Sequence, residues 1–112
     1  MSAARYNLVI DQGSDYAVEF AIAENGSAKN LTGYSARAQM RSSRTSSSVA
    51  ATFGCSISNP STGKIIMSMS NAVSTALTAG RYFYDLELFT SGDASVTRLL
   101  QGEVNLTQEV TR

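Results

Sequence analysis

The chain has 112 residues, of which 43% are hydrophobic, and its nine basic residues balance its nine acidic ones. This length suits a single domain over residues 1–112, with a core that needs no disulfide or metal to hold it. A net charge of zero provides no overall field that would attract nucleic acid or a membrane surface, so we expect no direct binding to either. The sequence contains no histidine, which removes the Ser-His-Asp and Cys-His catalytic arrangements and the commonest zinc sites. We therefore expect a protein that is not an enzyme and that has no catalytic residues, cofactor or metal.

The first residues lack the apolar segment of a signal peptide, and no apolar run approaches the length of a membrane span. The single cysteine, Cys55, cannot form a disulfide within the chain. We therefore expect a chain that is made in a reducing cytoplasm or that never needed the export route. Cys55 follows Gly54 in a stretch rich in Ser and Thr, with no basic neighbour to lower its pKa, so it is interpreted as a small buried residue.

Alternation of apolar and polar residues predicts strands along most of the chain, because successive side chains of a strand point to opposite faces. Turn signals separate these runs, including a loop at residues 24–30 and an Asn-Pro-Ser-Thr-Gly turn at residues 59–63. Residues 71–77 are compatible with one or two helical turns, capped by Ser70 or Asn71. Seven strands are predicted, at residues 6–10, 15–22, 34–41, 49–57, 64–70, 80–89 and 96–106.

The last two predicted strands form a hairpin around a short turn at residues 91–93, and Gly102 is a predicted bulge. Since almost no helix separates the strands, their pairing should be mostly antiparallel. The predicted fold is all-β: a single Ig-like antiparallel β-sandwich of about seven strands with one short helical turn. The term Ig-like refers to architecture only, because the sequence has no tryptophan and no pair of cysteines.

The inward faces of the strands predict the core. Strand 80–89 places Tyr82, Tyr84, Leu86 and Leu88 on one face. The predicted core consists of Tyr16, Val18, Phe20, Ile65, Met67, Tyr84, Leu86, Leu88 and Val104.

The opposite face of strand 80–89 is the candidate interaction surface. Burying Asp85 and Glu87 in the core would cost several kcal/mol unless both were paired. Two phenylalanines share their face, and grouped apolar residues at a surface are typical of an interface. We therefore predict that this face meets a second subunit, with Asp85 or Glu87 paired to an arginine across the boundary. The predicted interface residues are Phe83, Phe89, Asp85, Glu87, Ile66, Arg41 and Arg44.

Two further patterns have a functional and a structural interpretation. Asp11 and Asp15 flank Gly13, as calcium ligands do, but calcium needs six or more oxygens and a simple turn is favoured. Arg37, Arg41 and Arg44 concentrate positive charge near residues 42–48. Nucleic-acid binding would require aromatic stacking platforms nearby, so a mobile polar loop is the favoured interpretation.

The order of several short motifs is familiar. They are Leu-Thr-Gly-Tyr at residues 31–34, Ala-Gly-Arg-Tyr-Phe-Tyr-Asp-Leu-Glu at residues 79–87, Gly-Glu-Val at residues 102–104 and Val-Thr-Arg at residues 110–112. In this order they resemble the small all-β structural proteins of tailed bacteriophages, and are similar to the N-terminal domain of the upper baseplate proteins that attach receptor-binding proteins to a tail. The resemblance implies a β-sandwich scaffold module of the virion, with no catalytic residues to transfer.

The expected function is therefore that of a non-enzymatic bacteriophage virion structural protein, made in the cytoplasm of the bacterial host. Its expected partners are other virion proteins of the tail, neck or capsid, and it would act by docking and self-association, as a homo-oligomer or in many copies per particle. The sequence leaves open whether it is a tail, baseplate or neck adaptor or a head-decoration subunit. Residues 1–5 and 108–112 are predicted to lie on a partner or to add a strand to it. The alternative is a stand-alone carbohydrate- or ligand-binding β-sandwich module, with Tyr82, Tyr84 or Tyr34 as stacking surfaces.

Overall fold

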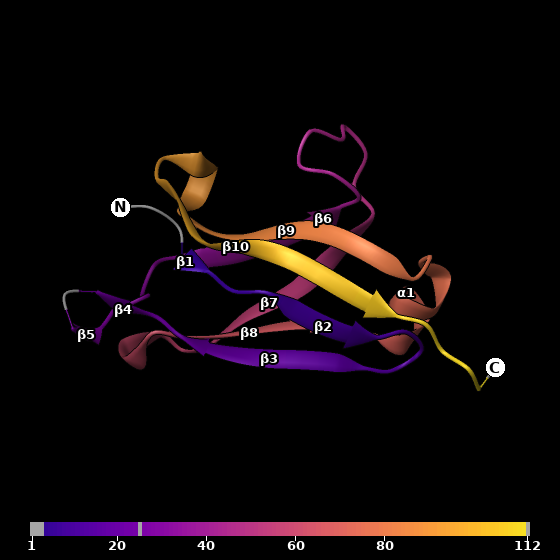
Figure 1. The fold of residues 1–112 in the computed structure, drawn as a ribbon. Helices are drawn as coiled ribbons and strands as arrows, with labels where there is room; N and C mark the ends of the chain where they lie inside the picture. Colours follow the sequence, from indigo (N-terminus) through magenta and orange to yellow (C-terminus); the bar gives the residue numbers. More distant parts are fainter. Residues whose placement is uncertain (1–3, 25, 112) are drawn as a thin grey trace.

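The structure, a computed structural model, describes residues 4–24 and 26–111 and is dominated by β-strands (Figure 1). Among these residues, no helix has the length and apolar character needed to span a bilayer. The elements in chain order are β1 (Ala4–Arg5), β2 (Leu8–Asp11), β3 (Tyr16–Ala21), β4 (Ala23–Glu24), β5 (Ser27–Ala28), β6 (Ser35–Arg41), β7 (Ala51–Asn59), the 3₁₀ turn η1 (Pro60–Thr62), β8 (Lys64–Met69), α1 (Asn71–Ala76), β9 (Gly80–Phe89), the 3₁₀ turn η2 (Ser91–Asp93) and β10 (Val96–Thr107).

One curled sheet forms the body of the protein, with strand order β1-β10-β9-β6-β7-β8-β3 and with β2 also paired to β10. Strands β10, β9 and β6 make an upper layer, and β7, β8 and β3 lie below them (Figure 1). The two layers are continuous because β7 changes partner along its length. Its residues 51–53 pair with β6, whereas its residues from Gly54 onward pair with β8. The predicted all-β fold is confirmed.

Most predicted strands agree with the observed ones to within a few residues, and the predicted helical segment matches α1. The hydroxyl of Ser70 caps this helix by accepting a hydrogen bond from the amide of Val73. The predicted first strand is divided into β1 and β2, and both run parallel to β10 while the other ladders of the sheet are antiparallel. The short β4–β5 hairpin lies in a segment predicted as loop.

The core fills the space between the two layers. Seven of the nine predicted core residues are buried there, while Tyr16 and Val18 are partly buried at its margin. Leu86 has no exposed surface and lies at the centre of the upper layer, opposite Ala38 on β6 and Leu100 on β10. The buried hydrophobic residues are Leu8, Ile10, Phe20, Leu31, Ala38, Met40, Ala51, Phe53, Ile65, Met67, Met69, Tyr82, Tyr84, Leu86, Leu88, Leu99, Leu100, Val104 and Leu106.

The prediction of a bulge at Gly102 is wrong, because the irregularity in the β9–β10 ladder lies between Arg98 and Leu100. The extra residue there is Leu99, and the bulge allows the consecutive side chains of Leu99 and Leu100 both to be buried. Gly102 pairs regularly with Tyr84. Its lack of a side chain serves a close approach instead, since a Cβ at this position would collide with the carbonyl oxygen of Tyr6.

A buried polar network closes the end of the sheet at α1. Ser74 is fully buried, and its hydroxyl accepts a hydrogen bond from the amide of Gly13 at 3.0 Å and donates to the carbonyl of Ser14 at 3.1 Å. The side chain of Gln12 donates to the carbonyl of Leu77 at 2.7 Å and accepts from the amide of Glu109 at 2.9 Å. The turn after β2 is thereby fixed to both α1 and the segment that follows β10.

Leu86→Ala is expected to lower the free energy of unfolding by about 2–5 kcal/mol, because it leaves a cavity in a closely packed core. The change is measured by chemical denaturation. Val9→Ala is the control, since Val9 is 62% exposed and its truncation should cost about 0.5 kcal/mol or less. A loss at Leu86 of under about 1 kcal/mol would contradict its place at the centre of the core.

Gly102→Ala is expected to displace the chain between β1 and β2 from β10, because the added methyl group meets the Tyr6 carbonyl and the side chain of Asn7. Hydrogen exchange should report this locally, with faster exchange of the Tyr6 amide, which donates to the Gln101 carbonyl at 2.9 Å. Gly54→Ala is the matched control within a strand, since its new methyl meets first the rotatable hydroxyl of Ser68. Equal protection of the Tyr6 amide in both variants would show that the close approach does not matter.

Candidate functional site

The surface of the upper layer that points away from the core carries charged and aromatic side chains from three strands, and we call it the outer face. On β6 and β9, Arg37 lies opposite Glu87, Gln39 opposite Asp85, and Arg41 opposite Phe83. On β10 the bulge at Leu99 keeps both Arg98 and Gln101 on this side, opposite Glu87 and Asp85. On β9, Leu86 and Leu88 point into the core, so alternation places Phe83, Asp85 and Glu87 on the outer face.

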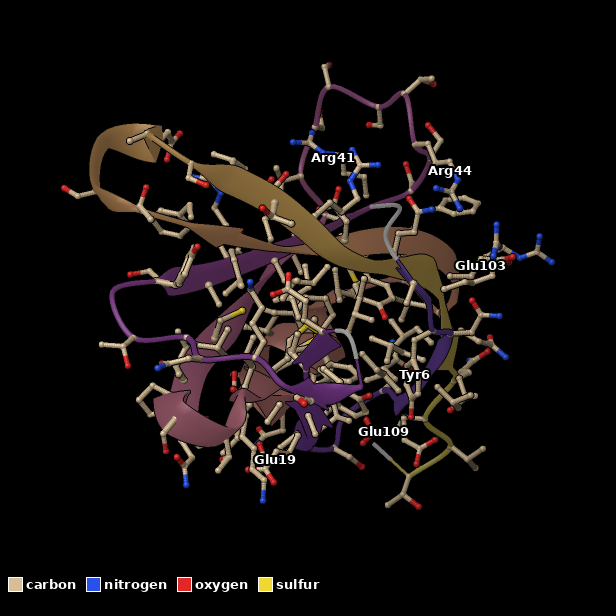
Figure 2. The ribbon with its side chains drawn as sticks, turned by 90° about the vertical axis from the view of Figure 1, so that its left-hand side faces the viewer. Tyr6, Glu19, Arg41, Arg44, Glu103 and Glu109 are labelled. Atoms are coloured by element: carbon tan, nitrogen blue, oxygen red, sulfur yellow. The ribbon has the colours of Figure 1, made fainter. Side chains whose placement is uncertain are left out.

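The outer face is hollowed by a depression of about 620 Å³. The loop at residues 42–48 rises beside it, and Figure 2 shows Arg41 and Arg44 at the base of this loop. The depression is lined by Arg37, Ala38, Gln39, Arg41, Ser43, Arg44, Phe83, Tyr84, Asp85, Glu87, Arg98 and Gln101.

Asp85 and Glu87, the two acids that line the depression, are paired within the chain. Arg37 donates from Nε to Glu87 Oε1 at 2.9 Å and from Nη1 to Asp93 Oδ1 at 3.2 Å. Arg98 Nε lies 3.4 Å from Asp85 Oδ2. An arginine from a second subunit is therefore not needed to neutralise either carboxylate. The pairing of Asp85 or Glu87 with an arginine across a subunit boundary stays a prediction, but the need to neutralise these acids no longer supports it.

The two phenylalanines of the outer face are each covered by a guanidinium group. Arg37 lies over the ring of Phe89, with 4.5 Å from Cζ to the ring centroid, and Arg44 lies over Phe83 at 5.0 Å. Both rings are half-buried. The cation–π contacts fix the long arginine side chains in place and leave the rings only partly in contact with water.

Asp85 lines the depression and interacts with charged side chains on three strands. Burial raises the pKa of its carboxyl group above the ordinary value, and repulsion from Glu87 raises it further. The positive charges of Arg98, Arg41 and Arg37 act in the opposite direction without cancelling this effect. The neutral form of Asp85 is therefore easier to reach in the folded protein than in the unfolded chain.

Two arginines at the depression have no carboxylate partner among the described residues. Arg41 donates to the carbonyl of Ser46 at 3.1 Å and to Gln39 Oε1 at 3.2 Å, both of which are neutral acceptors. Arg44 is exposed, and the contact that positions it is the one over Phe83. The lining of the depression thus contains four arginines and only two carboxylates.

The outer face brings together six of the seven predicted interface residues, and the exception is Ile66. This residue lies on β8 beside Glu19, and β6 and β7 separate it from β9. Figure 2 shows Glu19 on the opposite side of the molecule from Arg41 and Arg44. Arg37 and Arg98 also contribute to the outer face but were not predicted as interface residues. The consecutive pair Leu99-Leu100 breaks the alternation of β10. From the sequence alone, this pair could have indicated a bulge that leaves Arg98 on the outer face.

Other candidate residues of the sequence have structural surroundings. Cys55 is half-buried, and burial raises the pKa of its thiol to about 11, so the thiol stays protonated near neutral pH. Asp11 accepts a hydrogen bond from the Thr107 hydroxyl at 2.9 Å, and Asp15 accepts two from Asn71 at 2.8 Å. Across the described part of the chain, no three His, Cys, Asp or Glu side chains are grouped as metal ligands.

The predicted terminal docking segments differ in their surroundings. Ala4 and Arg5 form β1 and pair with Leu100 and Gln101 of β10. After β10 the amide of Glu109 is still bonded to Gln12, and beyond it the chain leads away from the body of the protein, with Val110 89% exposed (Figure 1). Residues 1–3 and 112 lie outside the described residues, so the prediction for them has no structural test.

Comparison with known proteins finds no family model that matches the chain and no match among curated proteins. The likeness to structural proteins of tailed bacteriophages therefore depends on the motifs at residues 31–34, 79–87, 102–104 and 110–112.

Asp85→Asn is expected to raise the free energy of unfolding at pH 7 by less than about 1 kcal/mol, since the carboxyl group is partly exposed. Because the folded state raises the pKa of Asp85, the wild type regains this stability as the pH falls through the folded pKa toward about 4, where an unfolded Asp titrates. The advantage of the variant should therefore shrink between neutral pH and about pH 4, as measured by denaturation at each pH.

Glu87→Gln is the companion variant, because it weakens the 2.9 Å pair with Arg37 and should lose about 0.2–1 kcal/mol at pH 7. If Asp85→Asn loses as much stability as Glu87→Gln, the pair between Asp85 and Arg98 outweighs the effect of burial.

Proposed function

We propose that this protein is a non-enzymatic structural subunit that docks onto neighbouring subunits through its outer face, and that its setting is the virion of a tailed bacteriophage. The order of the sequence motifs supports the setting, and leaves open the tail, baseplate, neck or head. The chemistry of the outer face supports docking and self-association.

The observation that carries the proposal is the combination of arginine and phenylalanine side chains on the outer face. Arginine and aromatic residues are enriched in protein interfaces and at the few positions that contribute most of the binding energy. Here Arg37 is fixed by Glu87, Asp93 and the ring of Phe89, so it is ordered before any partner arrives. Side chains that are ordered in advance lose less entropy on binding.

The alternative, a module that stacks sugars or other ligands on tyrosines, has less support. Tyr82 and Tyr84 are only 8% and 4% exposed, so their rings are not available as a stacking surface. Their hydroxyl groups donate to the carbonyls of Thr78 and Tyr6, at 2.5 Å and 2.6 Å. Tyr34 is partly buried, and Lys29 lies 5.7 Å from its ring centroid.

The test is the double variant Glu87→Arg, Phe89→Ser, which reverses one charge and removes one ring of the outer face. It should keep a β-rich circular dichroism spectrum, since both side chains lie outside the core. Its copy number in purified particles, measured by quantitative mass spectrometry after expression in the producing host, should fall about tenfold or more, because Arg37 loses both Glu87 and the ring of Phe89, which position it for docking. Sedimentation of the purified protein should show a matching loss of self-association.

The matched control is Glu19→Arg, Val9→Ser, which makes the same kind of change at exposed residues of β3 and β2. It should enter particles at the wild-type level. Wild-type incorporation of the outer-face variant would contradict docking through this surface, and absence of the wild-type protein from every particle fraction would contradict the virion setting.

A further inference from the structure

The positive charge of the depression exceeds what its own acids neutralise. Arg37 has two carboxylate partners and Arg98 has one, whereas Arg41 and Arg44 have none among the described residues. Arginines that share one concave surface repel one another, and the repulsion is relieved when an anion enters.

The unpaired arginines are also held with free hydrogen-bonding capacity. A guanidinium group has five N–H donors, and Arg41 uses two of them on Ser46 and Gln39. Its position is therefore fixed while other donors remain available. Arg44 is positioned by its contact with Phe83, on the same side of the depression. Fixed guanidinium groups with free donors bind carboxylates well, because the two groups match in a bidentate geometry.

We infer that the depression binds an acidic peptide segment of the docking partner, through Arg41, Arg44 and Arg98. The inference rests on the proposed docking function and names the chemistry of what docks. In an extended peptide, every second side chain points the same way at intervals of about 6.6 Å, so two acidic residues two positions apart reach neighbouring arginines along one surface. A segment with alternating Asp or Glu is the expected ligand.

The structure favours a peptide over a nucleic acid as the source of negative charge. Single-stranded nucleic acids bind by stacking bases on exposed aromatic rings, but guanidinium groups already lie over Phe83 and Phe89. Asp85 and Glu87 also line the depression and would repel a continuous phosphate backbone.

The experiment measures binding of a fluorescent hexaglutamate peptide by anisotropy at about 50 mM and about 150 mM salt, with hexaglutamine as the uncharged control. The wild-type protein should bind hexaglutamate and not hexaglutamine, and more weakly at the higher salt. Arg41→Gln with Arg44→Gln should weaken binding about tenfold or more, which corresponds to loss of at least one charge-assisted hydrogen bond. Arg41→Lys with Arg44→Lys keeps the charge and should show a smaller but clear loss, because lysine lacks the bidentate geometry.

The matched control is Arg5→Gln with Lys64→Gln, which removes the same charge at exposed positions outside the depression and should change binding less than about twofold. Equal losses in this control and in the Arg41, Arg44 variant would overturn the inference, since attraction would then depend on net charge alone. Failure of the wild type to bind hexaglutamate would also overturn it. So would a single-stranded oligothymidylate that binds at least as tightly and shows the same dependence on Arg41 and Arg44.

The two proposals fail separately. If hexaglutamate does not bind but the Glu87→Arg, Phe89→Ser variant still loses docking, the acidic partner is wrong and docking through the outer face stands. If hexaglutamate binds through Arg41 and Arg44 but that variant docks normally, the site stands and the proposed docking surface is wrong.

Discussion

Burial of one side of β9 is the constraint on which the rest of the structure depends. Leu86 and Leu88 are completely buried, and Tyr82 and Tyr84 nearly so, because β9 lies between β10 and β6 in the upper layer. A strand with one buried face has no freedom of register, since a slip of one residue would expose all four side chains. The same register fixes the residues between them on the outer face. The packing of the core therefore determines which charges meet at the surface.

Some features of the outer face lower the stability of the protein, and others hold the side chains of this face in a fixed arrangement. Asp85 is kept in a partly buried position that raises its pKa, close to a second acid. The ion pairs of Arg37 and Arg98 are partly exposed, and pairs of this kind contribute little to stability. Their main effect is to hold arginine side chains over rings and carboxylates in one arrangement. Such an arrangement suits recognition of a partner better than it suits stability alone.

Local patterns were sufficient to predict most of the fold, because alternation and turn chemistry act within a few residues. The strand at residues 80–89 and the turn at residues 59–63, which ends with Gly63 at a φ of 73°, are examples. The parallel pairing of β1 and β2 with β10 was not predictable, since it joins segments nearly 100 residues apart. Six of the seven predicted interface residues do lie on one face. The pairing of Arg37 with Glu87 and the different orientation of Ile66 could not be predicted, because they too depend on contacts between distant segments.

The bulge at Leu99 connects the fold to the candidate site. Before it, the outward residues of β10 have even numbers, as at Arg98, and after it they have odd numbers, as at Gln101 and Glu103. Without the extra residue, either Arg98 would point into the core or Leu100 would replace Gln101 at the surface beside Asp85. The first arrangement buries an unpaired charge and the second exposes a leucine, so the bulge permits a continuous core and a continuous polar surface on the same strand. Arg98 and Gln101 both line the depression, so the proposed binding of an acidic segment depends on this one inserted residue.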